Sequence, residues 1–142
     1  MFRVHQFNKV EMFVFTMPDE AWAEHDRMVA LEEDLLTQLG LPFRVVNVAA
    51  GDLGAPAANK IDIEAWFPSQ ERYREVTSCS NTTDFQARRL GIRVRGENGL
   101  ETPHTLNGTV VTDRALLAIL ENFQGEVPDV LHAYGAPARI AG

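Results

Sequence analysis

Period-two alternation of apolar and polar residues constrains the fold of this chain more than any other feature. The alternation is longest at 2–16 and recurs at 60–67 and 72–80, with turn residues between the segments. Such alternation is typical of β-strands that bury one face. The sequence predicts strands at 2–16, 42–50, 60–67, 72–80, 92–95 and 103–111, with a turn at 96–99.

Apolar residues at helical spacing predict two long helices and one short one. Pro18 suits the first turn of the first helix, and Gly40 stops it. Helices are expected at about 18–39, at 83–91, and from a cap at Thr112 or Asp113 to about Gln124, with an irregular tail from 127. Strands joined through turns, with helices set apart from them, indicate one α+β domain with a mostly antiparallel sheet.

The composition argues against several classes of protein. A net charge of -7 and a pI near 5.0 disfavour a broad surface for nucleic acid or anionic membrane. No stretch approaches the roughly 18 apolar residues of a membrane span, and the first residues lack the apolar core of a signal peptide. Cys79 is the only cysteine, so neither an internal disulfide nor a zinc site with several thiolates can form. We therefore expect a cytoplasmic chain with no membrane partner.

The polar face of the first predicted strand carries three side chains of different chemistry. Arg3, Phe7 and Glu11 lie four residues apart, which is roughly 13 Å between neighbours in a straight strand. A guanidinium pairs with phosphate, an aromatic ring stacks on a base and a carboxylate pairs with an amine. One ligand could meet all three only if the first residues curl back, since a straight strand separates the ends by about 26 Å. A solvent-exposed face with one aromatic residue remains the alternative.

Two later segments contain candidate ligands for phosphate and metal. Glu75 and Ser78 could share a magnesium ion, but an offset of three requires a β-bulge, and an ordinary polar strand is the alternative. Asn107 and Thr109 share one face of the last strand. Arg114, in the first turn of a helix, opposes the helix dipole, which phosphate contact would explain. An outward-pointing arginine is the other interpretation.

Taken together, three stretches resemble the C-terminal part of the catalytic domain of seryl-tRNA synthetases, which are class II aminoacyl-tRNA synthetases. The stretches are "FRVHQFNKVEMFVFT", the segment from "VAAGDLGAPAANKIDIEAWF" through "REVTSCSN" to "QARRL", and "TLNGTVVTDRALLAILENFQ". They follow the family order and cover nearly the whole chain. The resemblance implies a serine–tRNA ligase that activates L-serine with ATP and magnesium and transfers it to tRNA(Ser).

The resemblance also implies a role for each site residue. Catalytic roles fall to Arg3 and Arg114. ATP contacts fall to Arg3, Val4, Phe7, Glu75, Val76, Thr77, Ser78 and Arg114. Glu75 and Ser78 would bind magnesium together with ATP. Glu11, Asn107 and Thr109 would contact serine.

The chain departs from the family pattern in two ways. "NGTVVTDR" lacks the Gly-Leu-Ala run that usually precedes the motif 3 arginine, so the alignment of Arg114 can shift by one position. The tRNA-binding arm, motif 1 and the first motif 2 strand would all precede Met1. We therefore expect a gene fragment, half of a split enzyme or a truncated paralogue, with poor tRNA binding and little activity alone. Its partner would be the missing N-terminal segment or a homodimer partner.

Two alternative functions remain open. A truncated paralogue could bind nucleotide or a synthetase partner without catalysis. A ligase that charges carrier proteins is the other alternative, although known members use a zinc site with cysteine ligands and this chain has Cys79 alone.

Overall fold

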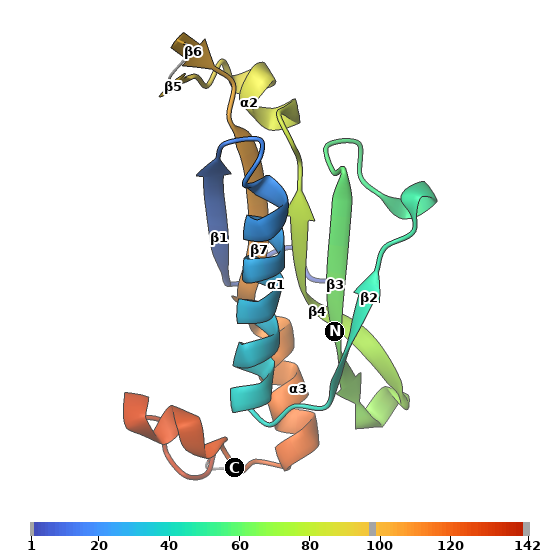
Figure 1. The fold of residues 1–142 in the computed structure, drawn as a ribbon. Coiled ribbons are helices and arrows are strands. Elements are labelled where there is room, and N and C mark those ends of the chain that lie inside the picture. The colour runs from blue at the N-terminus through green and yellow to red at the C-terminus, as the bar shows by residue number, and fades with distance from the viewer. Residues whose placement is uncertain (1, 97–98, 141–142) are drawn as a thin grey trace.

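A computed structural model describes residues 2–96 and 99–140, and it confirms the α+β fold with an antiparallel sheet. The main sheet has five strands in the order β1-β7-β4-β3-β2, and every neighbouring pair is antiparallel (Figure 1). The strands are β1 (Lys9–Thr16), β2 (Phe43–Asn47), β3 (Asn59–Phe67), β4 (Arg72–Asn81) and β7 (His104–Thr112). β1 therefore forms one edge of the sheet, and its outer side has no partner strand among the described residues.

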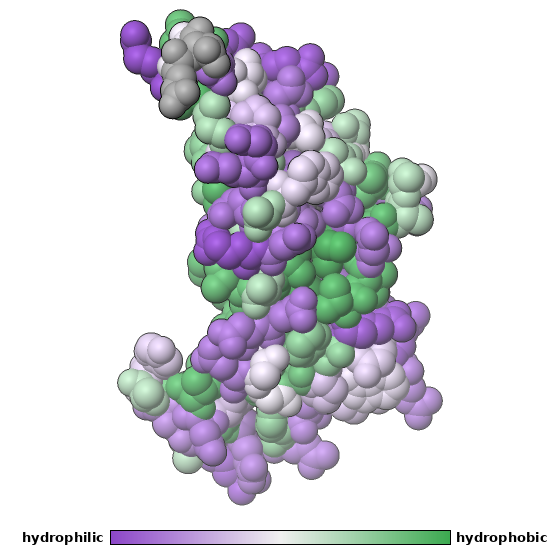
Figure 2. Space-filling view, viewed as in Figure 1, coloured by the Kyte–Doolittle hydropathy of each residue, from purple (hydrophilic) through white to green (hydrophobic). Residues whose placement is uncertain are grey.

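Two helices build the core on this sheet. Helix α1 (Ala21–Gln38) runs along one face, where Met28 and Val29 pack with Cys79 and Leu106. Helix α3 (Asp113–Phe123) follows β7 directly and closes a second cluster with the C-terminal end of α1. Figure 2 shows apolar residues gathered across the middle of the face that α1 covers, with polar residues above and below. Burial of Cys79 raises the pKa of its thiol to about 12, as expected for a packed and unreactive cysteine.

Two β-bulges interrupt the ladder. On β4, Thr77 pairs with Ile63 and Glu75 pairs with Glu64, so Val76 is an extra residue between them. On β7, Val111 pairs with Val10 and Thr109 pairs with Glu11, so Val110 is extra in the same way. A bulge moves residues three apart onto one face of the strand.

Strands β4 and β7 pair over only three residue pairs. Cys79, Ser80 and Asn81 face Gly108, Asn107 and Leu106. Beyond Cys79 and Gly108 the two strands part, and β4 continues beside β3 while β7 continues beside β1. We call this point of separation the fork. Both bulges lie on the separated arms of the fork, just past the last pair.

The predicted strand at 2–16 was wrong over its first half, because β1 begins only at Lys9. Phe2 instead packs edge-on against Phe67, with 5.2 Å between ring centroids. The main-chain nitrogen of Asn8 donates a hydrogen bond to Asp113 Oδ2 over 3.1 Å. These contacts draw the first residues back across the sheet.

The remaining elements follow the predictions with three exceptions. The strand predicted at 42–50 ends at Asn47, and Ala50–Asp52 forms a 3₁₀ helix. Helix α2 (Phe85–Leu90) and strand β5 (Val94–Gly96) match, and β5 pairs with β6 (Gly99–Glu101), which the sequence did not predict. The predicted turn at 96–99 contains residues 97 and 98, which lie outside the described residues. The tail is not wholly irregular, because Asp129–Tyr134 forms a 3₁₀ helix. No helix in the described ranges is both long and apolar enough to cross a membrane.

Candidate functional site

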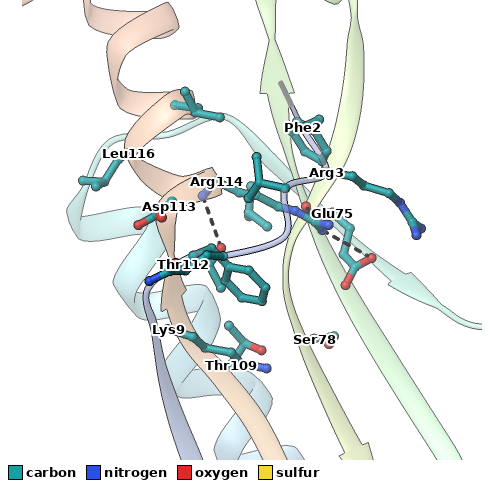
Figure 3. Close-up of a pocket in the computed structure, with 15 residues that line it drawn as sticks. Phe2, Arg3, Lys9, Glu75, Ser78, Thr109, Thr112, Asp113, Arg114 and Leu116 are labelled. Carbon is teal, nitrogen blue, oxygen red and sulfur yellow. Dashed lines mark hydrogen bonds and ion pairs between the residues drawn. The ribbon is translucent and has the colours of Figure 1, made fainter.

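A pocket of about 650 Å³ opens at the fork, between β4, β7, the start of α3 and the first residues of the chain (Figure 3). Eight of the residues singled out from the sequence line it: Arg3, Val4, Phe7, Glu75, Val76, Ser78, Thr109 and Arg114. They come from three segments that lie far apart in the sequence, at 3–7, 75–78 and 109–114. The separation of β4 and β7 leaves the space that these side chains surround.

The β4 bulge brings the two candidate metal ligands to one side. Glu75 and Ser78 both line the pocket, although a regular strand would place them on opposite faces. The bulged residue between them, Val76, is only 2% exposed and anchors the strand in the core. The β7 bulge acts likewise, because Thr109 and Thr112 both line the pocket.

Phe2 fixes the N-terminal segment at the pocket. Its ring lies 4.3 Å from the guanidinium carbon of Arg74 and 4.7 Å from that of Arg114. Cations over an aromatic face are attracted by the ring quadrupole. The first residues therefore curl back, as a single ligand for Arg3, Phe7 and Glu11 would require.

Arg114 is held at the N-terminus of α3 with its guanidinium directed at β4. The Thr112 hydroxyl caps the helix by accepting from the Arg114 main-chain nitrogen over 3.2 Å. Arg114 Nη1 donates to the Glu75 carbonyl oxygen over 3.1 Å and lies 3.8 Å from its carboxylate. In Figure 3 the Arg3 side chain extends away from Arg114, so the two cations do not share one position. Both remain within reach of an anionic ligand in the pocket.

The carboxylate of Glu11 lies beside the pocket rather than in its lining. Thr109 Oγ1 donates to Glu11 Oε2 over 3.2 Å, and Lys9 Nζ lies 2.6 Å from the same oxygen. The carboxylate of Glu11 is thus paired with the Lys9 ammonium in this structure.

Two predicted residues lie away from the pocket lining. The Thr77 side chain is buried and donates to Glu32 Oε2 over 2.9 Å, so any ligand contact would come from its main chain. Asn107 pairs with Phe13 and Ser80 in the closed part of the sheet. The pocket also includes residues that the sequence did not single out as site residues: Phe2, Gln6, Lys9, Thr112, Asp113, Leu116 and Leu117.

The sequence did not single out Glu32 as a residue near the site. It stands within an acidic run of α1 that resembles a solvated helix face, yet it is only 1% exposed. The sole sequence signal was its place on the apolar side of that helix, four residues after Met28.

The site can supply two ligands to a magnesium ion. The Glu75 carboxylate and the Ser78 hydroxyl are hard oxygen donors, which magnesium prefers, and both face the open pocket. Nowhere in the described ranges do three or more His, Cys, Asp or Glu residues gather as a metal site. The donor set therefore fits an ion that takes its other ligands from phosphate and water.

Comparison with known proteins decides the family. The family model for the tRNA synthetase class II core domain (G, H, P, S and T) matches residues 1–123. The chain belongs to this class II synthetase core family. Among curated relatives, the Serine--tRNA ligase of Nocardia farcinica is 59% identical across 86% of this chain and 29% of its own length. That of Pyrobaculum islandicum is 53% identical across 99% of this chain and 33% of its own. The chain thus spans about a third of the relatives' length.

Solved synthetase structures share its fold. The seryl-tRNA synthetase of Pyrococcus horikoshii complexed with ATP superposes with a TM-score of 0.92 at 47% identity, covering 99% of this chain and 34% of that one. The cytoplasmic serine-tRNA ligase of Naegleria fowleri in complex with AMP gives 0.89 at 44% identity, covering 98% and 35%. The class II architecture expected from the resemblance is therefore confirmed.

Proposed function

We propose that this chain forms the C-terminal portion of a serine–tRNA ligase catalytic domain, which activates L-serine with ATP and transfers it to tRNA(Ser). The observation that carries the proposal is the pocket at the fork, where phosphate-binding cations, an aromatic ring and oxygen ligands converge. Relatives named Serine--tRNA ligase support the choice of amino acid.

ATP would lie along the curled N-terminal segment. The Phe7 ring, 52% exposed, can stack on adenine, while Val4 and Val76 line the same space. Arg3 and Arg114 would pair with the phosphates, and Arg114 would exchange its contacts with Glu75 for the ligand. Magnesium, when bound, would neutralise phosphate charge, with Glu75 and Ser78 as its protein ligands.

Serine would lie at the β1–β7 side of the pocket. Glu11 would bind the substrate ammonium in place of Lys9, and Thr109, already bonded to Glu11, would orient that carboxylate. Asn107 would act from the closed part of the sheet, two residues before Thr109 on β7.

The reaction then needs positioning rather than a covalent enzyme intermediate. A serine carboxylate oxygen bonds to the α-phosphorus of ATP, and the bond from that phosphorus to pyrophosphate breaks. The tRNA 3′-terminal hydroxyl next attacks the carbonyl carbon of seryl-adenylate, and AMP leaves. Arg3 and Arg114 would stabilise the phosphate charge that develops in the first step, a type of contact worth about 10²–10³ in rate.

The net charge of -7 fits a chain that contributes little to tRNA binding. A cytoplasmic location is part of the proposal. A truncated paralogue that only binds nucleotide is the main competing function. A paralogue of this kind would bind ATP but form no adenylate, either alone or together with an added N-terminal segment.

Calorimetry with ATP and pyrophosphate exchange test the proposal. The chain is assayed alone and with the remaining N-terminal part of a serine–tRNA ligase relative supplied in trans. We expect ATP binding by the chain and serine-dependent exchange in the complemented sample. Exchange that depends on another amino acid, or none despite ATP binding, would refute the ligase assignment.

A further inference from the structure

Glu32 is a buried acid under the fork that the proposed reaction does not use. It projects from α1, is 1% exposed, and lies on the sheet face opposite the pocket. The alternation of the strands establishes this placement. Thr77 contacts Glu32 while its neighbour Ser78 lines the pocket, and consecutive strand residues point to opposite faces.

The carboxyl group contacts both strands of the fork. Its Oε2 accepts a hydrogen bond from the Thr77 hydroxyl of β4 over 2.9 Å. Its Oε1 lies against β7 at Gly108, where an added Cβ would stand only 2.8 Å away. A side chain at Gly108 would therefore displace Glu32, and the glycine makes the close approach possible.

The two contacts fall where β4 and β7 stop pairing. Gly108 belongs to the last pair, with Cys79, and Thr77 is the first β4 residue after the Val76 bulge. Ser78 and Thr109 are the next residues along the chain from these contacts, and both line the pocket. One side chain thus braces both arms of the fork directly beneath the site.

We propose that Glu32 is a positioning residue of this site, which holds the separation of β4 and β7 through Thr77 and Gly108 and thereby sets Ser78 and Thr109 at ligand distance. The part of this inference that concerns ATP rests on the proposed function. The bracing of the fork stands on the contacts alone.

The charge state of Glu32 follows from its surroundings. The pKa of the Glu32 carboxyl is raised to about 8, and burial is the largest cause. The Thr77 hydrogen bond lowers the pKa, the negative charges of Glu11 of β1 and Asp62 of β3 raise it, and the positive charge of Lys9 of β1 lowers it. On the α1 face itself lie His25 of α1, which bonds the Cys79 carbonyl oxygen, and the Cys79 thiol of β4, whereas Lys9, Glu11 and Asp62 act from the pocket face. The acid is therefore mostly uncharged at neutral pH, and Oε1 has no hydrogen-bond partner among the described residues. Ionisation would place an uncompensated charge under the fork.

Hydrogen exchange of the dilute 142-residue chain tests the bracing without any ligand. Glu32→Ala should speed exchange in residues 75–79 and 107–110 by roughly tenfold, the effect of one lost buried hydrogen bond, and leave the β2–β3 ladder unchanged. Glu32→Gln, which keeps the shape and the Thr77 contact, should match the parent below about pH 4.5, where the acid is largely protonated in every state. As pH rises from about 4.5 to about 8 the fork of the parent should exchange progressively faster, after correction for intrinsic rates, and Glu32→Gln should show no such rise.

Glu33→Ala is the matched control, since Glu33 is the adjacent acid on α1 and is less buried. It should behave as the parent. Exchange that rises equally across the whole sheet in Glu32→Ala would reduce Glu32 to a general stabilising residue and overturn the proposal. So would a fork in Glu32→Gln that still opens at high pH.

Calorimetry with ATP provides the second readout. Glu32→Ala should weaken ATP binding by roughly 10- to 100-fold, as lost supporting contacts do at ligand sites, and Glu32→Gln should restore it. ATP binding that is equal in parent and Glu32→Ala would overturn the positioning role. A parent chain that binds no ATP would refute the proposed function, while hydrogen exchange would still decide the bracing.

Discussion

The Thr109 hydroxyl donates a hydrogen bond to Glu11 Oε2 over 3.2 Å and joins strands that lie 98 positions apart in sequence. The two residues are register partners at the β7 bulge, so the bulge itself aligns their side chains. Lys9 Nζ occupies the same carboxylate oxygen at 2.6 Å. Under the proposed function, an amino acid substrate would displace the Lys9 ammonium while the Thr109 contact holds the Glu11 carboxylate in place.

Glu11→Gln should abolish most of the affinity for serine. The substitution keeps the contact with Thr109 but removes the charge that pairs with an ammonium, a loss of about 1.5–3 kcal/mol or roughly 10- to 100-fold in affinity. Calorimetry with a non-hydrolysable seryl-adenylate analogue, on the complemented enzyme, measures this loss. ATP affinity should stay unchanged, and Glu33→Gln serves as the control. An analogue that binds Glu11→Gln as tightly as the parent would contradict the role of Glu11.

Magnesium should bind at Glu75 and Ser78 only when ATP is present. Two protein oxygens cannot replace the hydration shell of magnesium, so phosphate oxygens must supply further ligands. Titrations of magnesium with and without ATP, followed by calorimetry, measure this dependence. Ser78→Ala should weaken the ATP-dependent binding, whereas Ser80→Ala, on the same strand but outside the pocket lining, should not. Tight magnesium binding without nucleotide would rule out the assigned role.

Local patterns predicted most elements of this fold but not the geometry that forms the site. The alternation at 60–67 and 72–80 located β3 and β4, because the second half of each strand buries every other residue. The same alternation misled at 2–8, because Phe2 packs against Phe67, a contact that no local pattern encodes.

The bulges and the buried acid escape sequence patterns for a similar reason. Val76 and Thr77 suit a strand whether or not one of them is extra, so only the pairing with β3 reveals the bulge. The need for a bulge was nevertheless evident from the spacing of Glu75 and Ser78. Burial of Glu32 depends on the missing side chain of Gly108, which lies on a strand far along the sequence.

Stability should depend on pH through Glu32. Its pKa is raised from 4.5 to about 8 in the folded chain, so the folded state holds a proton that the unfolded state has lost. The free energy of unfolding should therefore fall as pH rises between these two values, by up to about 1.4 kcal/mol per pH unit, and level off above them. Urea unfolding at several pH values measures this dependence. The free energy of unfolding of Glu32→Gln should fall less steeply with pH than that of the parent, by up to about 1.4 kcal/mol per pH unit. Equal slopes would mean that Glu32 ionises as an ordinary acid.

The 142-residue chain should self-associate through the outer edge of β1. This edge has no partner strand in the described part of the chain, and exposed edges pair readily with other chains. On the side of β1 that faces α1, Met12 and Val14 are half-buried against the helix. Exposed apolar surface on β1 lies at Val10, Phe13 and Phe15. The two phenylalanines are 49% and 52% exposed, and their rings pack edge-on with centroids 5.3 Å apart.

Light scattering against concentration measures this association. The parent chain should form assemblies that dissociate when the N-terminal part of a serine–tRNA ligase relative is added, because that part would cover the β1 edge. A double variant with Phe13→Lys and Phe15→Lys should stay monomeric, since charge on an edge strand opposes pairing. Tyr134→Lys is the control, because Tyr134 is 84% exposed in the C-terminal 3₁₀ helix, away from β1. The prediction is wrong if the parent chain stays monomeric at all concentrations and does not bind the added segment. The edge strand β1 would then be stable in water without a partner.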